Sequence, residues 1–252
     1  MVVFCHTEKF MISSRTNERI KAVRALQQHK ERERTGLHLI EGDKLVRDAA
    51  LSGAEIETIY ALSDADVPKG YEVVPVSPSV MEAISTQKTP QSLCAVVRTP
   101  STMCPITYPH GLIVALDRLQ DPGNLGTIAR TADALGASGI LLSPDSVDPY
   151  SPKALRAAMG STYHLPVWIG DLTAELPRLK QQGYACICGH LGGESVLPPH
   201  GEDVVLVVGN EGNGVSDAVA ALCSLYRMPM RGRAESLNAA VFAALMMQRL
   251  LG

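Results

Sequence analysis

The chain has 252 residues, of which 46% are hydrophobic and 19% charged, and a formal net charge of −3. This is the composition of an ordinary folded protein, long enough for one large or two small domains. The charge excludes a generally basic nucleic-acid coat but leaves room for a local basic face. No run approaches the roughly 18 apolar residues of a membrane span. The first ten residues look like an extension before Met11 and lack the apolar core of a signal peptide.

The cysteines and aromatic residues limit the kinds of metal site and nucleic-acid contact that we expect. No two CxxC units occur, so we expect reduced core thiols in a cytoplasmic protein and no metal site. With three Phe and one Trp, the chain has few rings on which nucleic-acid bases could stack. The cysteines are Cys5, Cys94, Cys104, Cys186, Cys188 and Cys223.

The first half of the chain begins with a basic segment from Ser13 to Arg34, which we predict to be helical. Lys21, Arg24 and Arg32 are its candidates for phosphate contacts, and a solvated helix face is the alternative. Strands and helices then alternate, which predicts a small α/β domain over residues 11–98. The predicted strands are 37–40, 56–61, 72–76 and 93–98, and the predicted helices are 43–52 and 78–85.

Residues 99–110 read TPSTMCPITYPH, with three prolines and no clear period. We predict a linker here. Strand–helix alternation over residues 111–252 then predicts a mostly parallel sheet covered on both faces. Asn124 is the expected cap of one helix and Ser236 that of the last. The predicted strands are 112–116, 140–142, 165–169, 185–188, 204–208 and 226–230, and the longer predicted helices are 124–135, 151–159, 172–182 and 237–251.

The apolar run Val204–Val208 stops at GNEGNG, residues 209–214, and a second extended stretch ends near Gly232. Ligands of open α/β sheets bind at the carboxyl ends of strands, so these loops predict a site. The lysine of a phosphate-binding P-loop is missing, and the order GxxGxG reverses the dinucleotide fingerprint. Glycine still permits close backbone approach to an adenine or a ribose.

Three segments in this order, NLGTIARTADALG, VVGNEGNGVS and MPMRGRAESLNAAV, resemble the three motifs of the SpoU/TrmH-type RNA 2′-O-ribose methyltransferases of the SPOUT superfamily. The similarity covers residues 112–252. Arg32-x3-Gly36 followed by LHLIEG resembles, more weakly, the substrate-binding domain often fused in front. The resemblance implies an α/β fold: a C-terminal knotted (trefoil) parallel-sheet SPOUT domain preceded by a small α/β RNA substrate-binding domain.

The same resemblance implies methyl transfer from S-adenosylmethionine to a ribose 2′-hydroxyl in RNA, with 23S ribosomal RNA favoured. A transfer-RNA ribose methyltransferase is one alternative. An RNA-binding protein that has lost catalysis is the other, although retention of all the motif residues argues against it. A cytoplasmic homodimer is expected, with an active site near the dimer interface and no membrane or metal partner.

Site residues follow from the motif positions. Arginine is effectively always protonated, so we expect Arg130 to bind an RNA phosphate rather than act as a base. Otherwise it is a surface ion-pair partner of Asp133 or Asp117. The alternative for Glu211 is a loop cap, and the alternative for Ser236 and Asn238 is that they are only helix caps. The candidate catalytic residues are Asn124, Arg130, Glu211, Ser236 and Asn238. The candidate cofactor-binding residues are Gly209, Asn210, Gly214, Met228, Met230 and Leu237.

Overall fold

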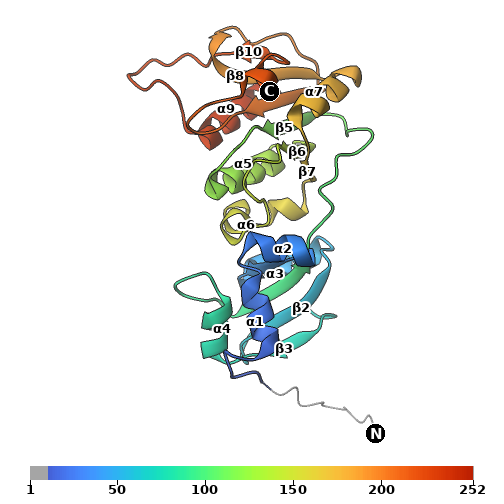
Figure 1. Ribbon diagram of the computed structural model, residues 1–252, viewed down its shortest axis with the longest axis vertical. Helices are drawn as coiled ribbons and strands as arrows, with labels where there is room; N and C mark the ends of the chain where they lie inside the picture. The colour runs from blue at the N-terminus through green and yellow to red at the C-terminus, as the bar shows by residue number, and fades with distance from the viewer. Residues whose placement is uncertain (1–10, 252) are drawn as a thin grey trace. The chain divides into compact units, whose positions relative to one another are not determined.

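The computed structural model describes residues 11–251 (Figure 1). The expected N-terminal extension, residues 1–10, lies outside the described residues. The chain divides into two compact units. The first runs up to Thr99 and includes Tyr150–Pro152, and the second takes Pro100–Pro149 and the chain from Lys153 onward. Each unit is described by itself.

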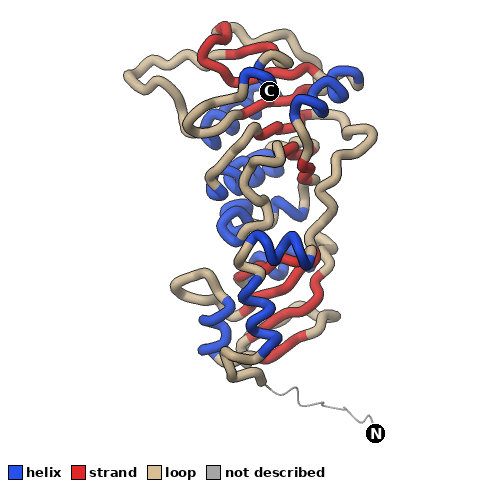
Figure 2. The backbone as a smooth tube through the Cα atoms, in the orientation of Figure 1, coloured by secondary structure: helices blue, strands red, loops and turns tan. Residues whose placement is uncertain are grey.

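The first unit is a four-stranded sheet of order β1-β4-β2-β3 with helices (Figure 2). Strand β4 is antiparallel to both β1 and β2, while β3 is parallel to β2. The expected elements of the small α/β domain are therefore present, apart from the first helix. The strands are β1 (Leu37–Glu41), β2 (Ile56–Ala61), β3 (Val73–Pro75) and β4 (Leu93–Arg98); the helices are α1 (Glu18–Ala25), α2 (His29–Thr35), α3 (Asp43–Leu51) and α4 (Pro78–Ile84).

The basic segment, predicted as one helix from residue 13 to 34, is in fact two helices. Helix α1 begins after Asn17, whose side chain accepts a hydrogen bond from the N–H of Arg19. The chain leaves the helix after Leu26 and forms α2, which ends at Gly36 in a left-handed conformation with φ 65°. Only glycine adopts this backbone freely, so the stop is built into the sequence.

The second unit contains a six-stranded sheet of order β10-β8-β9-β5-β6-β7, in which every neighbouring pair is parallel. This confirms the predicted parallel sheet. The strands are β5 (Leu112–Leu116), β6 (Gly139–Leu142), β7 (Val167–Ile169), β8 (Ala185–Glu194), β9 (Val204–Val208) and β10 (Ser224–Tyr226). The helices are α5 (Pro122–Ala134), α6 (Pro152–Ala158), α7 (Leu172–Gln181), α8 (Asp217–Ala220) and α9 (Ala239–Leu251), with a 3₁₀ turn at Ser161–Tyr163.

Both faces of this sheet are buried, which explains the continuous apolar runs of β5 and β9. Val114 and Leu206 point into a core shared with α5 and α9. Ile113 and Val205, their neighbours along the strands, point into a second core shared with α7 and α8. The prediction of a sheet covered on both faces is confirmed, and it leaves the carboxyl ends of the strands for a site.

Three local predictions in this unit were wrong. Asp121, not Asn124, caps α5, because its carboxylate accepts the N–H groups of Gly123 and Asn124. Helix α9 is capped by Asn238 rather than Ser236, since the Asn238 Oδ1 accepts from the N–H of Ala240 at 2.9 Å. The strand predicted at 226–230 lies earlier, at Ser224–Tyr226, where it pairs with Ile187, Cys188 and Glu194 of β8.

The segment predicted as a linker, residues 99–110, packs on the second unit along most of its length. The N–H of Ile169 donates to the carbonyl of Thr102 at 2.8 Å. Tyr108 is only 3% exposed, lies edge-on to Trp168, and donates from its hydroxyl to Glu175 at 2.8 Å. From Pro100 onward the segment is therefore part of this unit's structure.

Candidate active site

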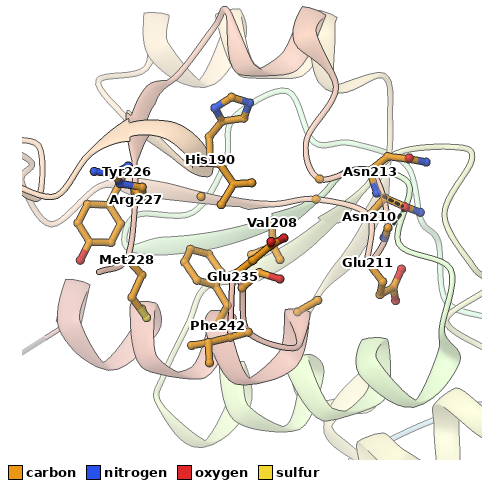
Figure 3. Close-up of a pocket in the computed structure, with 18 of the residues that line it drawn as sticks. His190, Val208, Asn210, Glu211, Asn213, Tyr226, Arg227, Met228, Glu235 and Phe242 are labelled. Carbon is orange, nitrogen blue, oxygen red and sulfur yellow. Dashed lines mark hydrogen bonds between the residues drawn. The ribbon is translucent and has the colours of Figure 1, made fainter. Parts of the chain in front are cut away.

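A cavity of about 290 Å³ lies at the ends of β9 and β10 and beside the middle of β8 (Figure 3). Its volume is near the lower end of the range for small-molecule sites. All six candidate cofactor residues line it, together with Glu211 and Ser236 from the catalytic set. Asn124, Arg130 and Asn238 do not line the cavity. The residues around it are Gly189, His190, Leu191, Val208, Gly209, Asn210, Glu211, Gly212, Asn213, Gly214, Tyr226, Arg227, Met228, Met230, Glu235, Ser236, Leu237, Ala239 and Phe242.

The loop after β9 is a preformed turn. Asn210 and Gly214 exchange two backbone hydrogen bonds of 2.9 and 3.0 Å, and Asn210 Oδ1 accepts from the N–H of Gly212. Gly214 has φ +68°, which favours glycine. A Cβ on Gly209 would lie 2.2 Å from the backbone of Gly214, so no other residue fits. The turn therefore presents a bare backbone edge to the cavity.

One hydrogen-bonded chain joins residues of all three motifs. Asn124 donates from Nδ2 to Glu211 Oε1 at 3.0 Å, and its Oδ1 accepts from Asn238 Nδ2, also at 3.0 Å. Asn124 is at the start of α5, Glu211 in the loop after β9, and Asn238 at the start of α9. The Asn124 amide bridges these partners because its NH₂ group donates to the carboxylate while its oxygen accepts from the second amide.

The Glu211 carboxylate is already engaged. Besides Asn124, it accepts the backbone N–H groups of Gln120 at 3.1 Å and Asp121 at 3.0 Å. Partial burial alone would raise the pKa of Glu211, but the hydrogen bonds from Asn124 and the backbone outweigh it, and the net pKa is lowered. An ionised carboxylate with these contacts holds the β9 loop against the start of α5.

Arg130 lies further along α5, and its side chain is exposed. Within residues 11–251 it has no ion pair, and both carboxylates considered as partners are engaged elsewhere. Asp133 contacts His164 at 3.0 Å, while Asp117 accepts the N–H of Ser216 at 2.6 Å. The guanidinium is therefore available to a ligand.

The cavity residues that the sequence candidates did not include are led by three with large side chains, His190, Glu235 and Phe242. Strand β8 was expected to end at Cys188 but continues past His190, which carries that side chain to the cavity. A Cβ on Gly189 would lie 2.4 Å from the Phe242 ring, so glycine lets α9 approach the strand. Glu235 directly precedes the motif residue Ser236, and this position was the available signal for it.

The three basic residues of the first unit that were predicted to contact RNA phosphates have different environments. Lys21 pairs with Glu18 at 2.7 Å on the surface, and Arg24 is exposed. The expectation for Arg32 needs correction. Its side chain is buried, and its Nη1 donates at 2.8 Å to the carbonyl of Leu26, a free acceptor at the end of α1. Arg32 therefore holds α1 and α2 together.

Two further observations concern metal ions and membranes. No group of three or more His, Cys, Asp and Glu side chains in the described part of the chain is arranged to hold a metal ion. No helix within the same residues is long and apolar enough to cross a membrane.

Comparison with known protein families decides the assignment. The model of the SpoU rRNA Methylase family matches residues 111–248, and that of the MRM3-like substrate binding domain matches residues 17–95. The chain belongs to the SpoU rRNA methylase family. The predicted family is thus confirmed, and so is the predicted substrate-binding domain in front of the parallel-sheet domain.

Individual members of the family are similar over almost the whole chain. The 23S rRNA (guanosine(2553)-2′-O)-methyltransferase RlmP of Bacillus subtilis (strain 168) is 34% identical over 248 residues, covering 96% of this chain and 99% of that protein. An AdoMet-bound rRNA methyltransferase from Sinorhizobium meliloti superposes with a TM-score of 0.86 at 34% identity, over 96% of this chain and 97% of that one. For AviRb from Streptomyces viridochromogenes, in complex with AdoMet, the TM-score is 0.84 at 26% identity, over 93% and 97%.

These similarities confirm two predictions about this SpoU family member. It is an S-adenosylmethionine-dependent RNA methyltransferase, and its cofactor is S-adenosylmethionine. The site agrees with that cofactor. The bare backbone of the β9 loop can approach an adenosine closely, Met228, Leu237 and Phe242 offer apolar contacts, and the carboxylates of Glu211 and Glu235 suit a cation.

Proposed function

We propose that the protein transfers a methyl group from S-adenosylmethionine to the 2′-hydroxyl of one ribose in 23S ribosomal RNA. The observation that carries this proposal is the hydrogen-bonded chain from Asn238 through Asn124 to Glu211, beside the cavity. It fixes all three motifs relative to one another. The full-length similarity to the B. subtilis enzyme favours 23S rRNA over transfer RNA. A cytoplasmic location follows from that substrate.

The cofactor cavity would hold S-adenosylmethionine through Gly209, Asn210, Gly214, Met228, Met230 and Leu237. The bound cofactor supplies an electrophilic methyl group on a positively charged sulfur. The chain itself positions the two reactants and shields them from water. The rate of a displacement of this kind depends on both effects.

We assign Arg130 to the RNA. Its guanidinium is permanently charged and unpaired within the described residues, so it binds a phosphate next to the reacting ribose and orients the hydroxyl. The pKa of Glu211 is lowered, so its carboxylate is ionised. We assign this carboxylate to holding the β9 loop in place, and not to accepting the hydroxyl proton. The hydroxyl proton then passes to phosphate or water. Ser236 lines the cavity and is exposed, so it is available to the hydroxyl or the cofactor.

We further propose that the chain between β10 and α9 forms the deep trefoil knot of the family. Two observations support it. Strand β10 is at the edge of the sheet, next to β8, whereas α9 returns to pack in the core beside β9 and α5. The chain must therefore pass back across the strand ends to reach that position, and the cavity lies along this passage.

A homodimer completes the proposal. Helix α9 buries Met246 and Met247, yet Val241 and Leu245 on its other side remain about half exposed. Helices that are apolar on more than one face usually pack against a further partner. Light scattering should give twice the 27 kDa chain mass, and V241E/L245E should give the chain mass. Wild-type protein at 27 kDa would contradict the dimer.

The test of the function uses purified full-length chain, S-adenosylmethionine with a labelled methyl group, and either unmodified 23S rRNA transcript or total tRNA. We expect the label in the 23S transcript as a 2′-O-methylnucleoside. Label in tRNA alone would establish the transfer-RNA alternative. A cofactor-binding protein that labelled neither RNA would be the inactive RNA-binding protein.

A further inference from the structure

The loop from Arg227 to Asn238 connects β10 to α9 (Figure 1). Part of it lines the cavity and part is exposed to solvent. Its first residues line the cavity up to Met230, and it lines the cavity again from Glu235 to Leu237. The four residues between, 231–234, do not line the cavity and are all exposed. We call residues 231–234 the loop tip.

The loop tip carries Arg231 and Arg233, and the nearest carboxylate in sequence, Glu235, lines the cavity. No Asp or Glu occurs between Asp217 and Glu235. Within residues 11–251 neither tip arginine forms an ion pair. Both guanidinium groups are therefore available to an anion, on the segment that borders the cofactor cavity on each side.

Basic residues of the first unit contrast with these two. The basic segment looks like the obvious phosphate-binding surface in the sequence, but most of its side chains are neutralised. Arg15 pairs with Glu82 at 2.7 Å, Arg19 with Glu72 at 2.9 Å, and Arg34 with Glu31 at 2.8 Å. A paired arginine must give up its carboxylate before it can bind a phosphate, so its net contribution to RNA affinity is smaller.

The loop is also held at both ends. Tyr226, just before it, is fully buried, and the N–H of Arg227 donates to the carbonyl of Glu194 at 2.8 Å. At the other end, Asn238 caps α9 and donates to Asn124. The loop is therefore tethered to the start of α5, the helix that carries Arg130 further along.

We propose that Arg231 and Arg233 bind backbone phosphates of the RNA strand whose ribose enters the active site. This inference rests on the proposed function and names its RNA contact. Guanidinium groups bind phosphate oxygens through paired hydrogen bonds, and two of them separated by one glycine suit neighbouring phosphates. The proposal thus places phosphate contacts on the cofactor loop as well as any that the substrate-binding domain makes.

The test measures binding of the full chain to unmodified 23S rRNA transcript over a range of salt concentrations. The variant R231Q/R233Q should lower the slope of log K against log salt by about 1.4, because each contact to a single strand contributes about 0.7. At moderate salt we expect affinity roughly tenfold lower or worse. R231K/R233K should keep the slope. The matched control R15Q/R34Q removes two ion-paired arginines and should leave slope and affinity unchanged.

Wild-type slope and affinity in R231Q/R233Q would overturn the proposal, and so would an equal loss in R15Q/R34Q, which would reflect net charge alone. Calorimetry with S-adenosylhomocysteine checks that the cavity still forms. If the glutamine variant disturbed it, the lysine variant decides, and a lost slope there overturns the proposal. Failure of the proposed function is a separate result, namely wild-type protein that binds the transcript but transfers no methyl group to it.

Discussion

Asn124 and Glu211 are joined by a 3.0 Å hydrogen bond, although 87 positions separate them in the chain. The bond ties the start of α5 to the loop after β9, and Asn238 extends it to the start of α9. Each residue comes from a different motif, so the geometry explains why the three motifs occur together.

The Glu211 clamp should be visible in the pH dependence of stability. The pKa of Glu211 is lowered in the folded protein, so its stabilising effect is complete above the unfolded pKa, near 4.5, and is lost as pH falls through the folded pKa. E211Q should therefore lower the melting temperature at pH 7, and the difference should shrink below pH 4.5. A difference from wild type that grew on acidification would contradict the clamp.

Arg130 should matter to turnover and hardly at all to the cofactor. R130A should reduce methyl transfer by about 100-fold or more at saturating RNA, because a positioning contact is lost. S-adenosylmethionine affinity by calorimetry should change only a few-fold, since Arg130 does not line the cavity. If R130A kept more than about a tenth of wild-type turnover, the role assigned to Arg130 would be wrong.

Two glycines of the same loop should behave differently. The Cβ added by G209A would meet the backbone of Gly214 and Val215 at 2.2 Å, so the turn must shift and cofactor affinity should fall steeply. In G212A the nearest atom is Asn210 Oδ1 at 3.5 Å, an ordinary contact, and affinity should be retained. Calorimetry on both variants is the measurement, and equal affinities would show that the turn does not form the site.

The second unit should be more stable as an isolated fragment when it keeps the segment before β5. A fragment of residues 100–252 retains Tyr108 against Trp168 and its hydrogen bond to Glu175, whereas a fragment of residues 111–252 loses both. We expect the longer fragment to bind S-adenosylmethionine and to melt at a clearly higher temperature. Identical melting curves would mean that residues 100–110 are a passive linker after all.

The sheet of the second unit was predictable because buried parallel strands are apolar throughout. LIVAL and VVLVV matched β5 and β9 residue for residue. Caps were harder. Asp121 and Asn124 are both good cap residues three positions apart, and only the structure shows which side chain accepts the helix N–H groups.

Charge was the least predictable feature. The sequence shows a dense basic segment, but not that Arg15 and Arg19 reach Glu82 and Glu72, more than fifty residues away, or that Arg32 turns inward to the end of α1. Those contacts depend on how α1 packs against the sheet and α4. The cavity residues fared better because the motifs named them directly.

The most direct test of the account is a map of ribose methylation by mass spectrometry on total RNA from a strain that lacks the protein. The account predicts that one 2′-O-methylated nucleotide of 23S rRNA disappears, and that it returns with wild-type protein but not with R130A. If every 2′-O-methylated position of 23S rRNA were unchanged in the deletion strain, the central claim would be contradicted.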